Sequence, residues 1–231
     1  MKLLKAEHEC RPMRIHDLVP DFTLEDVWAL PVAGGPEDFE ALLDLTGSFD
    51  PSQVESRAAR FLWDLRDRLG SWFGLGEVSV PVEGDGPGEL PIPGNSETSL
   101  RDRLPPDLRD TGAGVSFDPL PFVPLYRTDR EAAAEVSNKT VHGVAHLAWV
   151  EGDEGRYQGQ MAVYVKPRGA FGRAYMALIK PFRHWVIYPA LMRQMERAWD
   201  ARMKEKGRDQ AGNDAAATSS TDRSRFATES E

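Results

Sequence analysis

The segment from Tyr157 to Trp199 constrains the fold of this 231-residue chain more than any other part. It begins with the alternating stretch YQGQMAVYVKPRG, which predicts a β-strand, and continues into a long helical stretch rich in aromatic residues. Large apolar residues recur there at steps of four and three, which places them on one side of an α-helix. We expect that side to be buried against a sheet; its residues are Phe171, Tyr175, Leu178, Phe182, Trp185, Pro189 and Met192.

Two prolines interrupt this helical stretch. Pro181 and Pro189 each remove one backbone hydrogen bond, so the helix is expected to bend or break near Lys180 and Tyr188. A bent helix is able to follow the surface of a curved sheet.

The rest of the chain predicts an α+β domain with an antiparallel sheet. Asp21 to Leu30 is typical of a half-exposed first strand with a slip near Asp26. Two helices are expected after it, a short one opened by Pro36 and a longer, well-capped one beginning at Asp50. Four further strands are expected as a meander over residues 121–127, 131–137, 139–150 and 156–166, and the turn EGDEGR joins the last two.

The same patterns predict the domain organisation. Residues 1–20 are expected to be a flexible segment, and residues 21–203 a single domain. Residues 76–119 read as a long insertion, because prolines and glycines break every regular pattern there. Residues 204–231 contain only Phe226 as a large apolar side chain, which predicts a disordered tail.

Charge and composition argue against several classes of protein. The 28 Lys and Arg residues face 37 Asp and Glu, and the formal charge of -9 disfavours binding to nucleic acid. Cys10 is the only cysteine, which fits a reducing cytoplasm. No segment is typical of a signal peptide or of a membrane span, so we expect a cytoplasmic protein without stable membrane insertion.

His142 and His146 are the residues most suggestive of chemistry. A spacing of four brings two histidines together on a helix, but in a strand it separates them by roughly 13 Å on one face. They are therefore not expected to bind one metal ion, and structural, hydrogen-bonded histidines are favoured over catalytic ones. The opposite strand face carries the small Gly143 and Ala145, which leave room for a bulky helix side chain or for a bound molecule.

The other candidate motifs give little evidence of a functional site. His8, Glu9, Cys10 and His16 are ligand-type residues, but their spacing matches no known metal site. The glycine-rich stretch GDGPGELPIPGN lacks the Lys and Ser or Thr that end a phosphate-binding loop. No nucleophile with a positioned base is evident, and no metal or cofactor is expected.

The order of elements resembles the helix-grip fold of the START and Bet v 1-like (SRPBCC) superfamily, in which a sheet curls around the last helix. More closely, DFTLEDVWALP and AVYVKPRGAFGRAYMALIKPFRHWVIYPALMRQ are similar to the DUF2867 family, which has no assigned biochemical role. This resemblance covers residues 21–199 and names no catalytic residue. It implies an α+β helix-grip domain, and helix-grip proteins commonly hold a hydrophobic ligand between the sheet and the last helix.

Three hypotheses about function follow. The first is a protein that binds a small hydrophobic molecule between the sheet and the C-terminal helix. The second is a cyclase- or dehydratase-like enzyme that uses His142 or His146 with Tyr164 as acid and base groups. The third is a peripheral membrane or protein-interaction module, which requires the surface around Trp185 and Tyr188 to be exposed. The oligomeric state stays open. The candidate ligand-binding residues are Asn138, His142, His146, Trp149, Tyr164, Tyr175 and Trp185.

Overall fold

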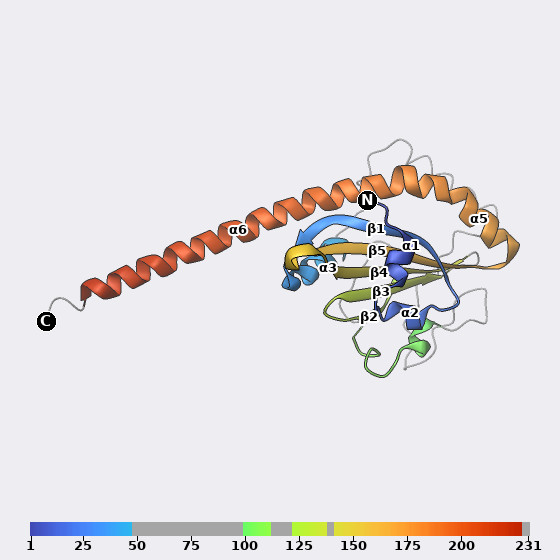
Figure 1. Ribbon diagram of the computed structural model, residues 1–231, viewed down its shortest axis with the longest axis horizontal. Helices are drawn as coiled ribbons and strands as arrows, with labels where there is room; N and C mark the ends of the chain where they lie inside the picture. Colours follow the sequence, from blue (N-terminus) through green and yellow to red (C-terminus); the bar gives the residue numbers. More distant parts are fainter. Residues whose placement is uncertain (48–98, 112–121, 138–140, 228–231) are drawn as a thin grey trace. The chain divides into compact units, whose positions relative to one another are not determined.

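The computed structural model describes residues 1–47, 99–111, 122–137 and 141–227. Within these residues the chain is an α+β protein with a curved, five-stranded antiparallel sheet of order β1-β5-β4-β3-β2 (Figure 1). The predicted meander is confirmed, as is the first strand, which lies at the edge beside the last one. The strands are β1 (Thr23–Gly34), β2 (Val123–Arg127), β3 (Glu131–Ser137), β4 (Val141–Glu151) and β5 (Tyr157–Pro167).

Strand β1 shows the irregularity that its sequence predicts. Its pairing with β5 shifts register between Leu24 and Asp26, which places Asp26 opposite Val163. The outer edge of β1 is covered by the first residues of the chain, because the amide of Leu3 donates to the carbonyl of Val27 over 2.9 Å. This pairing occupies backbone groups that an edge strand leaves open.

The turn between β4 and β5 also has the predicted chemistry. Glu154 and Gly155 both adopt positive φ angles, of 60° and 70°. The amide of Gly152 donates to the carbonyl of Arg156 over 2.8 Å and closes the hairpin. Glycine tolerates this conformation at little cost, which explains its place in the turn.

The first 20 residues differ from the prediction of a flexible segment. They form the short helices α1 (Lys5–Glu9) and α2 (Ile15–Leu18), and Ile15 is completely buried. Leu18 and Val19 join a core that includes Leu100 and Leu104 from the predicted insertion. The apolar surface buried by this segment offsets the entropy of ordering it, a balance that local sequence pattern does not reveal.

Helix α3 (Phe39–Gly47) follows the 3-10 turn η1 (Pro36–Asp38), as predicted, and buries Phe39, Leu42 and Leu43. The 3-10 turn η3 (Leu100–Arg103) marks the described end of the insertion. The helix expected from Asp50, the second of the two predicted after the first strand, lies outside the described residues. So does most of the insertion.

The C-terminal helix is interrupted where the prolines predict. Helix α5 (Gly169–Phe182) ends in one π-helical turn, η5 (Arg183–Ile187), and α6 (Tyr188–Ala227) follows. Pro181 and Pro189 flank this turn, and a prolyl residue cannot supply the amide that continues a regular ladder. The bend therefore has a local chemical cause.

The buried side of this helix differs from the predicted one. Leu178 and Trp185 are 65% and 80% exposed, while Met176 and Tyr188 are buried. Polar partners on the sheet explain the difference, because Arg183, His184 and Tyr188 turn toward Asp26. The spacing of apolar residues gives no information about such polar contacts.

The chain divides into two compact units, residues 1–195 and residues 196–231. In the second unit α6 continues to Ala227, where the sequence predicted a disordered tail from residue 204. None of the helices in the described part of the chain combines the length and the apolar character that a membrane span requires.

Candidate functional site

The two faces of the sheet have different chemistry. Because side chains alternate along a strand, paired residues share a face. His146 pairs with Ala162, so it shares a face with their alternate neighbours Gln160 and Tyr164, which we call the polar face. Val163 pairs with both Ala145 and Asp26 on the opposite side, which we call the helix face because Asp26 contacts the C-terminal helix.

On the polar face, His8 joins helix α1 to strand β5. Its ring nitrogens lie 2.9 Å from the amide oxygen of Gln160 and 2.8 Å from the hydroxyl of Tyr164. His16 extends the chain of contacts, since its Nδ1 lies 3.3 Å from the same hydroxyl. Burial lowers the pKa of His8 to about 4, and the neighbouring His146 adds to the effect. His8 is therefore neutral at pH 7.

Glu131 is the centre of a second buried group on this face. It lies 3.1 Å from Nε2 of His146, accepts a 3.0 Å hydrogen bond from the Tyr126 hydroxyl and accepts the backbone amide of Arg14. Burial would raise the pKa of Glu131, but these donors outweigh it and hold the pKa below its usual value. Burial lowers the pKa of His146, whose Nδ1 has no hydrogen-bond partner.

His142 has its own carboxylate. Its Nε2 lies 2.9 Å from Glu135, which also accepts the hydroxyl of Ser99 and the amide of Leu100. As the strand geometry predicted, His142 and His146 share a face and bind separate partners. Together these contacts fasten residues 1–22 and 99–108 to the sheet.

The polar face offers no metal site in the described residues. No group of three His, Cys, Asp or Glu side chains there, or elsewhere in the described part of the chain, is arranged to hold an ion. A hollow of about 200 Å³ opens beside Tyr126 and is lined by Arg14 and Arg103. Both arginines are paired, with Asp107 and Asp21, so the hollow presents no unbalanced positive charge.

The helix face carries an apolar surface that is incompletely covered. Val136, Ala145, Met161 and Val163 are partly exposed, although they lie on interior strands. We call these four residues the apolar patch. A methyl group added at Gly143 would have the Val136 side chain and two backbone oxygens as its nearest neighbours, at 3.4 to 3.9 Å. Among the described residues, no helix side chain is one of these three nearest neighbours.

One end of the patch borders a buried ionic cluster centred on Asp26, which is fully buried. Its carboxylate lies 2.6 Å from Nε2 of His184 and 3.1 Å from both Nη2 of Arg183 and the Tyr188 hydroxyl. Lys2 lies 3.5 Å away. Burial alone would raise the pKa of Asp26, but these partners reverse the effect and lower it. The cluster therefore holds an ionised carboxylate between β1 and the π-helical turn.

The predicted ligand residues fall into separate places. His142, His146 and Tyr164 lie together on the polar face and contact residues of the N-terminal segment and the insertion. Trp149 lies on the opposite face, as strand alternation required, where its indole donates to the carbonyl of Gly35 and stacks on Tyr157. Tyr175 is partly exposed on α5, Trp185 is highly exposed, and Asn138 lies outside the described residues.

Sequence reasoning missed the partners that matter most on both faces. The sequence predicts a half-exposed strand with a slip near Asp26, and that slip is the one signal of the unusual position of Asp26. The spacing of His8 and His16 fits no metal site and gives no sign of their contacts on the polar face. Their partners lie about 150 residues away in sequence, which no local pattern reveals.

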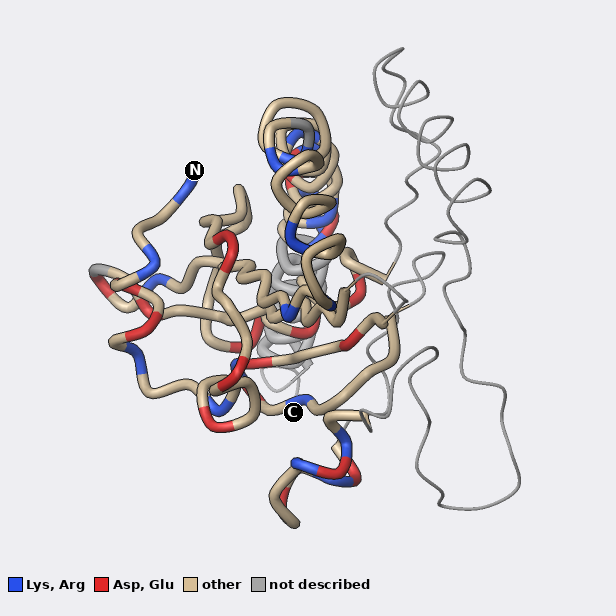
Figure 2. Tube along the Cα trace, turned by 90° about the vertical axis from the view of Figure 1, so that its right-hand side faces the viewer, with Lys and Arg blue, Asp and Glu red and all other residues tan. Residues whose placement is uncertain are grey.

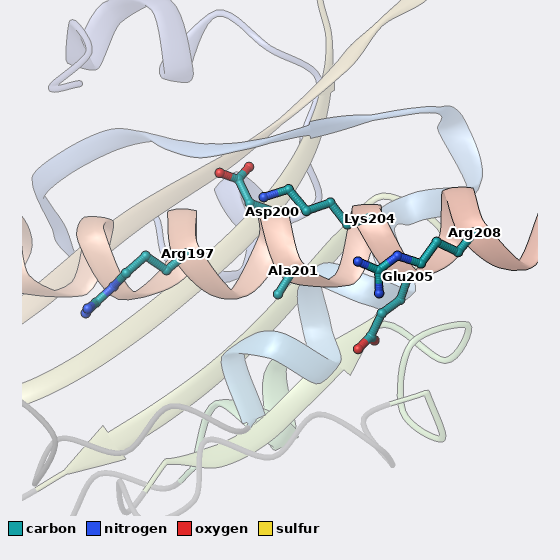
Figure 3. A pocket seen from close by; sticks show the side chains of 6 residues that line it. All are labelled: Arg197, Asp200, Ala201, Lys204, Glu205 and Arg208. Atoms are coloured by element: carbon teal, nitrogen blue, oxygen red, sulfur yellow. The ribbon is translucent and has the colours of Figure 1, made fainter.

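A further hollow lies on helix α6, in the second unit (Figure 3). All of its lining residues come from this one helix, so it is a groove between charged side chains and not an enclosed site. They are Arg197, Asp200, Ala201, Lys204, Glu205 and Arg208.

Comparison with known proteins agrees with the resemblance noted from the sequence. The family model DUF2867, described as a protein of unknown function, matches residues 18–190. Comparison with the curated proteins gives no significant match. Comparison with the solved structures also gives none. The matched region spans β1 to the start of α6 and contains the apolar patch and Asp26. The chain belongs to the DUF2867 family.

Proposed function

We propose that this protein binds a small hydrophobic molecule on the helix face of its sheet, between the apolar patch and the C-terminal helix. The observation that carries the proposal is the contrast between the two faces. In the middle of β4 and β5 the polar-face residues Val144, His146 and Ala162 are buried, while Ala145 and Val163 on the helix face are partly exposed. Elsewhere on these strands the helix face is covered, since Leu147, Trp149 and Val165 are buried. Partly covered apolar surface is what a ligand site offers.

Covering 100 Å² of apolar surface contributes roughly 2.5 kcal/mol, so a ligand that covers the patch gains free energy that the folded chain alone leaves unused. Ala145 and Gly143 are small, which keeps the surface open. A larger side chain at either position would occupy the ligand's space.

We also infer a helix-grip architecture of the START and Bet v 1-like (SRPBCC) type. A curved antiparallel sheet, a short helix after the first strand and a long C-terminal helix support this assignment. The inference is one of fold, and fold alone does not determine function. We expect the protein to act in the cytoplasm, where an exposed, unpaired Cys10 is stable.

Binding is favoured over the enzyme hypothesis for a geometric reason. The acid and base groups of that hypothesis, His142, His146 and Tyr164, lie on the polar face. A molecule on the apolar patch would be separated from them by the sheet itself. Catalysis by these three residues would need a different substrate site.

An interaction role is the second candidate, because Trp185 is 80% exposed on a helical segment that carries basic residues. This role predicts that the protein cosediments with anionic lipid vesicles and that Trp185→Ser weakens cosedimentation. The buried Tyr188 does not take part in such a surface. Absence of cosedimentation by the unaltered protein would rule out the membrane form of this role.

The binding proposal is tested by titrating the protein with 1-aminoanthracene, a neutral apolar dye, and following dye fluorescence. Ala145→Trp fills the space over the patch and is expected to abolish saturable binding. Ala177→Trp adds the same side chain at an exposed position of α5 and serves as the matched control. Circular dichroism verifies that both variants fold, and Val163→Phe provides a second way to fill the patch. Equal dye affinity in all four proteins would contradict the proposal.

A further inference from the structure

We propose that the ligand carries one carboxylate, which is recognised by Trp28 and Arg183 at the end of the apolar patch beside Asp26. This inference rests on the proposed function and adds the chemical class of the ligand, an apolar monocarboxylic acid. It starts from two hydrogen-bond donors for which the described part of the chain supplies no acceptor.

The two donors are Nε1 of Trp28 and Nε of Arg183. Both atoms are buried from solvent and neither has a hydrogen-bond partner. A buried polar group without a partner is uncommon and costs folding free energy, so these two donors need an explanation. The remaining contacts of these residues show that they are well fixed: Trp28 packs 4.9 Å from the Tyr188 ring, and Arg183 binds Asp26.

Strand register places these donors at the border of the apolar patch. Trp28 pairs with Met161, and Asp26 pairs with Val163, so both lie on the helix face directly beside two patch residues. Arg183 reaches the same place from the π-helical turn through its bond to Asp26. A ligand whose apolar body covers Met161 and Val163 therefore ends beside Trp28, Asp26 and Arg183, and of these Trp28 and Arg183 carry the donors without a partner.

The charges of the cluster favour a single negative charge on the ligand. Lys2, Lys180 and Arg183 are cations, whereas Glu25 and Asp26 are the carboxylates paired with them. Three positive charges against two negative ones leave one positive charge, before any contribution from His184. One carboxylate balances this excess, and a phosphate monoester, with up to two charges, exceeds it.

The wider electrostatic setting agrees. Between Gly169 and Met195 the chain carries Arg173, Lys180, Arg183 and Arg193 and no acidic residue, although the protein as a whole is acidic. Figure 2 shows basic residues in blue and acidic residues in red along the chain trace. A positive local potential attracts an anion to this helix. Guanidinium and indole N–H groups both donate to carboxylate oxygens, and bonds to a charged acceptor are the stronger ones.

The test compares dodecanoate with dodecanol as competitors that displace 1-aminoanthracene from the protein. The two molecules share one apolar chain, so they differ in the carboxylate. We expect dodecanoate to displace the dye at about tenfold lower concentration than dodecanol, which is the effect of one charge-assisted hydrogen bond. Trp28→Phe and Arg183→Lys are each expected to reduce this preference severalfold.

Trp149→Phe is the matched control. Its indole also lies on the helix face, but it donates to Gly35 over 2.8 Å, so its removal breaks an existing bond. This variant is expected to lose stability and keep the preference for dodecanoate. Trp28→Phe breaks no hydrogen bond within the protein. A weaker preference of this variant for dodecanoate would therefore reflect the loss of a contact with the ligand.

The outcomes separate the two proposals. If the unaltered protein binds no dye, the proposed function fails and the carboxylate inference fails with it. If the dye binds but dodecanoate and dodecanol displace it equally, binding stands and the carboxylate inference is overturned. A preference for dodecanoate that survives both Trp28→Phe and Arg183→Lys also overturns it, because the carboxylate is then bound elsewhere.

Discussion

Mild acidification is expected to destabilise the protein through His8. This residue is completely buried between α1 and β5, where burial holds its pKa at about 4 against 6.5 for the free side chain. The unfolded chain therefore binds a proton more readily than the folded one between these pH values. A lowered histidine pKa gives stability that is complete above pH 6.5 and is lost as the pH falls toward 4.

The size of the effect follows from the shift. A difference of about 2.5 pKa units corresponds to about 3 kcal/mol in the free energy of unfolding, since each unit is worth about 1.4 kcal/mol. Between pH 7.5 and pH 5 about 2 kcal/mol of this is lost, because most of the window between the two pKa values has been crossed. His146 acts in the same direction, since burial lowers its pKa too.

Urea denaturation followed by tryptophan fluorescence measures this loss at a series of pH values. His8→Gln removes the titrating ring, so the unfolding free energy of this variant is expected to fall by about 2 kcal/mol less than that of the unaltered protein between pH 7.5 and pH 5. Ile15→Val is the control. It weakens packing in the same N-terminal segment by about 1 kcal/mol and should leave the pH dependence unchanged.

Titration of the buried carboxylates does not contribute to the stability change in this pH window. The pKa values of Asp26 and Glu131 are lowered, so their contributions are lost only at more acidic pH than the window used. If His8→Gln and the unaltered protein showed the same dependence between pH 7.5 and pH 5, the account of His8 as a buried neutral residue would be wrong.

Two further predictions concern packing and charge. Gly159→Ala is expected to lower the free energy of unfolding in urea denaturation by about 1 to 3 kcal/mol, because the added methyl group would lie 2.5 Å from Val32. In the control Gly207→Ala the methyl group meets nothing within 4 Å, so this change should be neutral or slightly stabilising. Equal effects of the two substitutions would contradict the packing around Gly159. Asp26→Asn removes the charge that holds the π-helical turn and is expected to cost about 3 to 5 kcal/mol, so an unchanged denaturation midpoint would refute the role of the cluster.

Local sequence patterns were sufficient for much of the sheet and its turns. Within Tyr157–Pro167, residues 160 to 164 alternate between buried and partly exposed, which is a property of that strand alone, whereas Glu131 to Glu135 are buried on both faces. Pro181 and Pro189 act on their own helix, so the interruption between them could also be predicted.

The candidate sites depended on contacts that sequence spacing does not encode. The apolar period of the C-terminal helix suggested that Trp185 faces the sheet, yet the helix is oriented by Arg183, His184 and their bonds to Asp26. The N-terminal segment lacks a strong pattern, and its position depends on His8 meeting Tyr164 far along the chain. The faces of β4 could be separated by alternation, but alternation does not tell which face meets the helix.

Native mass spectrometry of the purified protein, compared with its denatured mass, tests the central claim most directly. We expect the folded protein to carry or take up dodecanoate as a single bound molecule and to lose this molecule on unfolding. Ala145→Trp should not bind dodecanoate, whereas Ala177→Trp should. A folded protein that takes up no hydrophobic molecule, or an Ala145→Trp variant that binds as well as the unaltered chain, would contradict a ligand site on the apolar patch.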